Sequence, residues 1–225
     1  MKEGTAYATR LKKAYAEHRQ SAPKPDLPAA DDPLRRLAIA ILAVSSSDAE
    51  AEHALDRALS SMAGWNEIRV SSAEEVYAAI GNRLADGLQH CRRLIDALND
   101  VYDRENRLSL DRLKGIGRRE ARQYLEGLSG VDEYAVASVL LWSLGGHGIP
   151  VNDALWKALR DAHLVHPGAS RGEVQAFLER HVSAADARDF CVVMQSFAPK
   201  KNSDRKTAAP KLKSPAAEAA RRKKT

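Results

Sequence analysis

Two short segments near the middle of the chain have residue types that could bind phosphate groups. The first is a tight connection in which Gly130 supplies a permissive backbone between apolar neighbours. A turn of this kind directs backbone N–H groups and a helix N-terminus outward, which suits an anion. It also fits an ordinary connection between helices. The residues of this first turn are Leu128, Ser129, Gly130 and Val131.

The second segment is a glycine-containing turn flanked by cations. It reads Leu-Lys-Gly-Ile-Gly-Arg-Arg over residues 113–119. The turn and its cations could together form an additional phosphate contact, and the alternative is again a plain helix connection. The residues concerned are Lys114, Gly115, Gly117, Arg118 and Arg119.

Helices must position these turns, because strand signals are nearly absent. Ala, Leu, Arg and Glu dominate, and no period-two alternation exceeds a few residues. Residues 33–44 are apolar on nearly all faces, which predicts a central buried helix. Ser47 or Asp48 is expected to cap the next helix, and Ser72 with Glu75 predicts a capping box before a short helix. Further helices are predicted over residues 6–19, 84–102, 109–113, 118–125, 132–144, 153–162, 171–181 and 184–197. The fold class is therefore all-α.

The composition excludes several classes of protein. The 225 residues include two cysteines, Cys91 and Cys191, too few for a disulfide scaffold or a four-cysteine zinc or iron–sulfur site. The histidines show neither an i, i+4 pair nor a cysteine partner, so we predict no metal site. No apolar run approaches the roughly 20 residues that span a bilayer, and the first residues are too polar for a secretory signal. We therefore expect an intracellular protein, in the cytoplasm and nucleoid or, in a eukaryote, in the nucleus.

The positive charge is concentrated at the C-terminus. Residues 199–225 hold ten Lys and Arg against Asp204 and Glu218, a net charge of +8, and the rest of the chain carries −3. A tail rich in Lys, Ala and Pro cannot bury enough apolar surface to offset the entropy of ordering, so we expect it to be disordered. Its predicted role is to neutralise nucleic-acid phosphates, with solubility alone as the alternative.

The order of motifs between residues 33 and 198 resembles the helix-hairpin-helix Gly/Pro-Asp superfamily of DNA glycosylases, the group that contains endonuclease III. Leu128-Ser-Gly-Val is similar to the family's hairpin, and Ile149-Pro-Val-Asn is similar to the loop that opens a later helix. Residues 32–48 resemble the early buried helix and the turn after it. Glu120-Ala-Arg-Gln-Tyr-Leu looks like a pattern that precedes the hairpin in the plant demethylase branch.

This resemblance implies a fold of two helical lobes with a cleft between them. It also implies duplex DNA as the partner, with a damaged or mismatched base as the feature recognised. We expect a monomer without a small-molecule cofactor. The implied units are an N-terminal helix and Pro-rich linker (1–32), a glycosylase-like domain (33–198) with a barrel lobe (about 48–148) and a second lobe (33–47 plus 151–198), and the basic tail (199–225).

The departures from the family concern its catalytic groups. By the resemblance, Tyr134 stands where bifunctional members have the lysine that forms a Schiff base, and Asn152, 18 residues later, stands where members have a carboxylate. A phenol cannot form a Schiff base, and a neutral amide can neither accept a proton nor supply a full negative charge. Asp153 is a further candidate carboxylate, although an acid in the first helical turn also simply complements the helix dipole. The family's iron–sulfur cysteines are missing as well, so no cluster is expected.

Several of these residues have a structural interpretation beside the functional one. Asn152 would cap the following helix, and Tyr134 would either line a pocket for an extruded base or belong to the core. Arg83 lies in a loop where the family often places a wedge, or is an ordinary surface arginine. Asp132 and Glu133 follow the first turn and should repel DNA unless they lie off the contact face.

The sequence therefore predicts a DNA-binding protein of the base-excision-repair type with absent or reduced catalysis. At most it would remove a damaged or mismatched base without lyase chemistry. One alternative is a non-enzymatic DNA-damage recogniser or architectural DNA binder, and another is a scaffold that has lost DNA binding. The repair interpretation requires the turn at Gly130 and the helix after Val151 to face a common groove.

Overall fold

The chain is helical throughout the described residues, and the all-α prediction is confirmed. The computed structural model describes residues 4–21, 31–81 and 84–197, and within these ranges it contains no strand. Arg83 and the basic tail lie outside the described residues. The helices are α1 (Gly4–Ser21), α2 (Pro33–Ala43), α3 (Asp48–Ser61), α4 (Trp65–Val70), α5 (Ala73–Ala79), α6 (Gly87–Glu105), the 3-10 helix η1 (Asp111–Gly115), α7 (Arg118–Glu126), α8 (Glu133–Trp142), α9 (Asp153–Asp161), α10 (Arg171–His181) and α11 (Ala187–Phe197).

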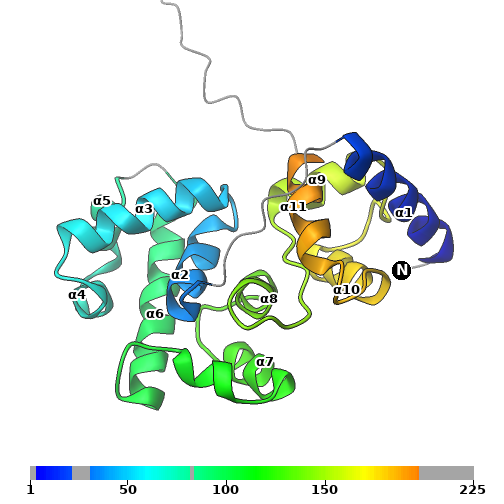
Figure 1. Cartoon of the computed structure of the whole chain (residues 1–225). Coiled ribbons are helices and arrows are strands. Elements are labelled where there is room, and N and C mark those ends of the chain that lie inside the picture. The colour runs from blue at the N-terminus through cyan, green and yellow to red at the C-terminus, as the bar shows by residue number, and fades with distance from the viewer. Residues whose placement is uncertain (1–3, 22–30, 82–83, 198–225) are drawn as a thin grey trace, which may run out of the picture.

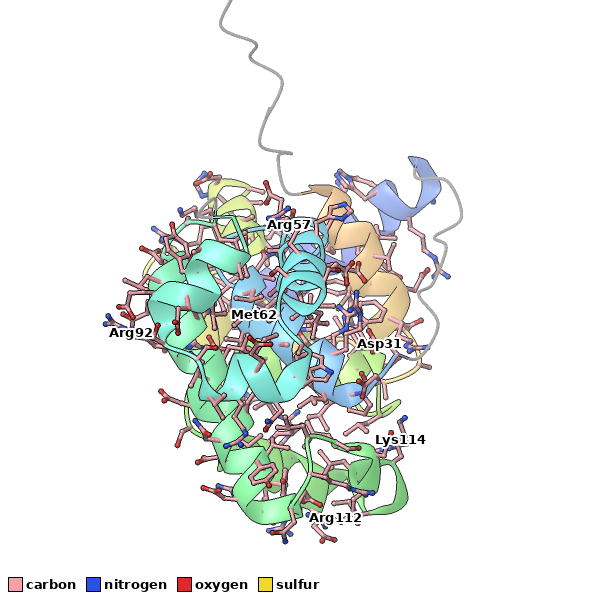
Figure 2. All side chains as sticks on the ribbon, turned by 90° about the vertical axis from the view of Figure 1, so that its left-hand side faces the viewer. Asp31, Arg57, Met62, Arg92, Arg112 and Lys114 are labelled. Carbon is pink, nitrogen blue, oxygen red and sulfur yellow. The ribbon has the colours of Figure 1, made fainter. Side chains whose placement is uncertain are left out.

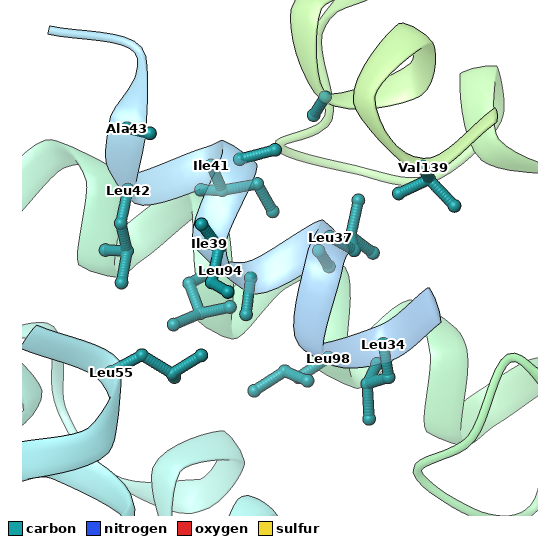
Figure 3. Close-up of a cluster of buried hydrophobic side chains, with 14 of the residues drawn as sticks. Leu34, Leu37, Ile39, Ile41, Leu42, Ala43, Leu55, Leu94, Leu98 and Val139 are labelled. Atoms are coloured by element: carbon teal, nitrogen blue, oxygen red, sulfur yellow. The ribbon is translucent and has the colours of Figure 1, made fainter. Parts of the chain in front are cut away.

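Helix α2 is buried along almost its whole length, as its apolar sequence predicts. Leu34, Leu37 and Leu42 are each at most 1% exposed, and they pack among side chains of α3, α6 and α8 (Figure 3). Burying a leucine contributes about 1.5–3 kcal/mol relative to leaving it exposed. The burial of this one helix therefore fixes the positions of its three neighbours.

The buried side chains form two clusters with α8 between them. The first cluster takes side chains from α2 to α8, and the second takes them from α1, α9, α10, α11 and the last residues of α8, Leu141 and Trp142. In Figure 1, α2–α6 gather on the left and α1, α9, α10 and α11 on the right. The expected lobes assigned residues 33–47 to the second unit, whereas the buried residues of α2 pack in the first cluster. The division into domains stays a prediction.

Local capping signals set several helix starts. Ser47 caps α3 and Ser72 caps α5, each in a reciprocal capping box with the glutamate three residues later. The sequence did not predict α4, which has six residues and begins after Gly64 at a φ of 100°. A helix this short has too few turns to show a clear periodicity.

Candidate functional site

Three segments that are distant in sequence meet at the N-terminal turn of α8. The N–H of Asp153, at the start of α9, donates to the carbonyl of Val44 at 3.3 Å. The hydroxyl of Ser45 donates to Asp153 Oδ2 at 3.4 Å, and the hydroxyl of Tyr134 donates to Asp48 Oδ1 at 2.8 Å. The connection between α2 and α3 thus touches the beginnings of both α8 and α9.

Tyr134 is a core residue. Its side chain is 2% exposed, and burial, followed by the negative charge of Asp48, raises the pKa of Tyr134 well above 10. Asp48 also pairs with Arg36 Nη1 at 3.2 Å, which fixes the carboxylate beside the phenol. The phenol is therefore neutral near pH 7 and belongs to the core. At Tyr134 the structure does not form the common groove that the repair interpretation requires.

Asn152 and Asp153 begin α9 in different roles. Asn152 Oδ1 accepts from the N–H of Leu155 at 2.9 Å, so the amide serves as the N-cap. The Asp153 side chain is 38% exposed, and its Oδ1 lies 3.5 Å from Arg171 Nη1. We call the place where Ser45 meets Asp153 and Asp48 meets Tyr134 the α2–α8–α9 junction. Asp153 reaches this junction, whereas the side chain of Asn152 caps its own helix.

Arg171, the first residue of α10, ties the junction together. Its guanidinium lies 2.9 Å from Asp132 Oδ2, 3.7 Å from Glu133 Oε1 and 3.5 Å from Asp153 Oδ1. Asp132 caps α8 by accepting from the N–H of Ala135 at 3.0 Å, and it also pairs with Arg93 Nη2 at 3.2 Å. Asp132 is therefore compensated by two arginines within the fold, whereas Glu133 is half exposed and, among the described residues, pairs only with the shared Arg171.

The first predicted turn is pressed against α6. Gly130 has a φ of +74°, and a Cβ placed there would lie 2.3 Å from the carbonyl oxygen of Arg93, so only glycine fits. Arg93 Nε donates to the carbonyl of Gly130 at 2.8 Å. The N–H of Ser129 donates to Asp100 Oδ2 at 2.7 Å. A carboxylate of α6 thus already accepts from the N–H of Ser129, and a phosphate contact at this turn stays a prediction. Leu128 is buried and Val131 is half-buried, as expected beneath such a turn.

The second predicted turn lies toward the other end of α8. Lys114 pairs with Asp111 Oδ1 at 2.6 Å, and Figure 2 shows Lys114 near Arg112 at the lower end of the molecule. A Cβ at Gly146, which follows the C-terminus of α8, would lie 3.4 Å from Arg118 Cδ. Because α8 has ten residues, its two ends are about 15 Å apart. The residues of this second turn therefore lie too far from the α2–α8–α9 junction, at the N-terminal end of α8, to take part in it.

The second turn carries two arginines whose guanidinium groups could contact a phosphate. Arg118 and Arg119 are exposed and have no ion pair within the described ranges. A methyl group added at Gly115 or Gly117 would meet no atom within 4 Å, so the backbone is open to solvent there. A phosphate contact at these residues stays a prediction.

Sequence reasoning missed His90 and Arg171. His90 is 4% exposed, and neither ring nitrogen has a partner among the described residues. Burial, then Arg93, lowers the pKa of His90, although nearby carboxylates oppose the shift. Arg171 is an ordinary helix-start arginine in sequence. No local spacing marks either residue, because their neighbours come from other helices.

Two cavities among the described residues lie apart from this junction. One lies between Gly4 and Phe177 and a second lies beside Arg57, and neither is lined by a residue of the α2–α8–α9 junction. Among the described residues, no group of three or more His, Cys, Asp or Glu is placed to hold a metal ion. No helix in those ranges has both the length and the apolar character needed to cross a bilayer.

Comparison of the whole structure with solved structures gives consistent matches. A non-covalent endonuclease III–DNA complex is 15% identical with a TM-score of 0.68, and the match covers 96% of this chain and 99% of that chain. A thermostable thymine-DNA glycosylase is 16% identical with a TM-score of 0.58, covering 91% of this chain and 90% of that chain. The chain has the helix-hairpin-helix DNA glycosylase fold. The resemblance assigned the hairpin to residues 128–131, which join α7 to α8, and that assignment stays a prediction.

An 8-oxoguanine glycosylase/lyase from Clostridium acetobutylicum in complex with duplex DNA has the same fold. It is 13% identical with a TM-score of 0.61, and the match covers 87% of this chain and 70% of that chain. No family model and no curated protein matches the sequence. The glycosylase fold is thus established by structure, at a sequence identity that leaves the activity to be argued from the site.

Proposed function

We propose that this chain is a DNA-binding protein of the base-excision-repair type that has lost lyase chemistry and has absent or reduced base-excision activity. If it removes a base, it does so as a monofunctional glycosylase acting on a damaged or mismatched pair, whose base is already weakly stacked. The observation that carries the proposal is a helix-hairpin-helix glycosylase fold whose two expected catalytic positions hold a buried phenol and a capping amide.

The chemistry of Tyr134 supports the loss of lyase activity. Schiff-base formation needs an amine that can become neutral and reach the sugar. The Tyr134 hydroxyl instead donates to Asp48 at 2.8 Å in the core, and its raised pKa keeps it protonated. This side chain offers neither a nucleophile nor access.

The chemistry of Asn152 supports reduced base excision. A sugar that develops positive charge is stabilised by a carboxylate, and an amide supplies only a partial charge. The Oδ1 of Asn152 is already engaged by the N–H of Leu155. Asp153 carries a full charge one residue later, but Arg171 and Ser45 both contact it.

The competing function is a non-enzymatic DNA-damage recogniser or architectural binder. The ion-pair network around Arg171 favours it, because three carboxylates and two arginines pair with one another at the beginnings of α8, α9 and α10, beside the two expected catalytic positions. Both functions require DNA binding, and they differ in whether a base is released.

A titration separates binding through the folded domain from binding through the tail. Duplexes with and without an abasic-site analogue are titrated against the full chain and against a chain ending at residue 198, over a range of salt concentrations. A repair-type protein retains its preference for the abasic duplex after truncation. Loss of all binding on truncation, with no preference for the lesion beforehand, would refute the proposal.

Substitutions at the two replaced positions test the catalytic argument. Asn152→Asp and Asn152→Ser both keep a helix cap, but only the first supplies a carboxylate. We expect Asn152→Asp to raise base release and Asn152→Ser to leave it unchanged. Because position 134 is buried, the double variant Tyr134→Lys/Asn152→Asp should cut an abasic strand no faster than the matched Tyr134→Met/Asn152→Asp. Strand scission by the lysine variant and not by the methionine variant would show that position 134 reaches the sugar, and it would contradict the argument from burial.

A further inference from the structure

A second cationic surface lies on the side of the molecule formed by α1 and the end of α9. Arg10 Nη1 donates to the carbonyl of His163 at 3.1 Å, and its guanidinium lies over the Tyr7 ring, 4.6 Å from the centroid. The Tyr7 ring in turn meets the His166 ring edge-on at 6.3 Å. These contacts join α1 to the connection between α9 and α10. We call the surface made by Arg10, Lys157, Arg160, His163 and His166 the α1/α9 face.

Arg160 repeats the arrangement of Arg10 on the same connection. Its guanidinium lies 4.7 Å from the centroid of the Trp156 ring, and the indole N–H donates to the carbonyl of Ala169 at 3.1 Å. The Nε of Arg160 is buried and has no hydrogen-bond partner among the described residues. Both guanidinium groups therefore lie over aromatic rings, and these contacts limit the entropy lost when the arginines bind a ligand.

Neither of these arginines has a carboxylate partner within the described ranges, unlike the arginines of the junction. Residues 4–17 contain Arg10, Lys12 and Lys13 against Glu17, which pairs with Lys13 at 3.9 Å. Residues 154–169 contain Lys157 and Arg160 against Asp161. A carboxylate on α10, that of Glu173, also lies near this face, beside His166. It accepts hydrogen bonds from Ser170 in the capping box that begins α10. The α1/α9 face thus carries Arg10, Lys157 and Arg160 against the carboxylates of Asp161 and Glu173, a small excess of positive charge in a body whose net charge is negative.

The chemistry of this face favours a phosphodiester backbone as the partner. Guanidinium groups fixed in a plane suit phosphate oxygens. The Tyr7 ring is 8% exposed and the Trp156 ring is half-buried and covered on one side by Arg160, so the face offers bases little surface on which to stack. Membrane anchoring needs apolar side chains that can insert. The exposed large apolar side chains of the described residues are Val70 and Tyr102, on α4 and α6.

We infer that the α1/α9 face binds the backbone of a DNA duplex without reading its sequence, as a contact separate from the helix-hairpin-helix. Arg160 is at the C-terminal end of α9 and Asn152 is at its N-terminus, about 12 Å away along the helix. In Figure 1, α1 lies at the outer edge of the right-hand group, away from α2–α6. The inference depends on one part of the proposed function, namely that the chain binds DNA.

The test measures the salt dependence of binding to an undamaged duplex by the full chain. Arg10→Gln/Arg160→Gln removes two cations and should lower the magnitude of the slope of log K against log salt by about 2. The matched control is Arg69→Gln/Arg92→Gln, because Arg69 is also stacked on a ring, 4.2 Å from the centroid of Tyr102, but lies on α4. The control should keep the wild-type slope.

A chemical footprint locates the contact independently. Acetylation of Lys157 by a soluble reagent should slow several-fold when the duplex is added to the wild-type chain, and Arg10→Gln/Arg160→Gln should abolish that protection. Equal slopes in the two double variants, with Lys157 modified as fast with DNA as without it, would overturn the inference while DNA binding itself stands. Protection by phosphatidylserine vesicles and not by the duplex would also overturn it. A wild-type chain that binds no duplex at any salt concentration refutes the proposed function as well.

Discussion

The substitution Arg171→Met should destabilise the fold by removing the common partner of three carboxylates. The side chains of Arg171 and Asp132 are 19% and 17% exposed, so their ion pair is intermediate between a solvent-exposed pair and a fully buried one. An exposed pair contributes about 0.2–1 kcal/mol, and removal of one member of a buried pair costs about 3–5 kcal/mol. Because this pair is mostly buried, and because Arg93 still compensates Asp132, we expect a loss of about 2 kcal/mol in the free energy of unfolding.

A double-mutant cycle isolates the contribution of this pair. Asp132→Asn removes the charge while keeping an excellent cap for α8, so the cycle with Arg171→Met reports the charge interaction. We expect a coupling energy of about 1–2 kcal/mol. The measurement is urea unfolding at pH 7, and the single variant Arg171→Met should also lower Tm by about 4–8 °C.

The control for this experiment is a pair on the molecular surface. Arg92 and Glu74 lie 3.1 Å apart with side chains 59% and 64% exposed, so Arg92→Met should cost less than about 0.5 kcal/mol. Two results would refute the view that Arg171 stabilises the junction. In one, the losses in unfolding free energy from Arg171→Met and Asp132→Asn simply add in the double variant. In the other, Arg171→Met is as stable as Arg92→Met.

Burial and backbone geometry lead to three more expected outcomes. Gly130→Ala should cost more than about 2 kcal/mol in urea unfolding, because its Cβ meets the Arg93 backbone at 2.3 Å, while Gly115→Ala, with open space around it, should be close to neutral; equal effects would contradict this. His90 has a lowered pKa, so the unfolded chain binds a proton first as pH falls below about 6.5. Stability should therefore drop between pH 7 and pH 5, and His90→Leu should reduce that drop; an unchanged pH dependence would count against a neutral buried imidazole. Burial raises the pKa of the Cys91 thiol to about 12 and also raises that of Cys191, so neither should react with an aromatic disulfide at pH 8 until urea unfolds the chain.

Local patterns in the sequence were sufficient to predict most of the helices. The apolar run of α2 and the capping residues Ser47 and Ser72 act within one or two helical turns, and each has the predicted role in the structure. The family resemblance, carried by residues 128–131 and 149–152, predicted the fold that the structural comparison bears out. These signals succeed because the interactions behind them are short in sequence.

The contacts that join distant segments at and beside the α2–α8–α9 junction could not be predicted from such local patterns. Tyr134 meets Asp48 across 86 residues, and Ser129 meets Asp100 across 29. Arg171 reaches Asp132 across 39 residues. Such pairs depend on which helix faces pack together, and no spacing within one segment encodes that choice. The sequence placed Tyr134 equally well in a pocket or in the core, and only the packing of α2, α3 and α8 distinguishes the two.

The proposal that this glycosylase-fold protein binds DNA without lyase chemistry is best examined by borohydride trapping. The full chain is incubated with a duplex that contains one natural abasic site, reduced with borohydride, and analysed by denaturing electrophoresis beside a native gel of the same mixture. We predict a shifted complex on the native gel and no covalent adduct on the denaturing gel, because Tyr134 supplies no amine. An adduct formed in good yield by the wild-type chain would contradict the account.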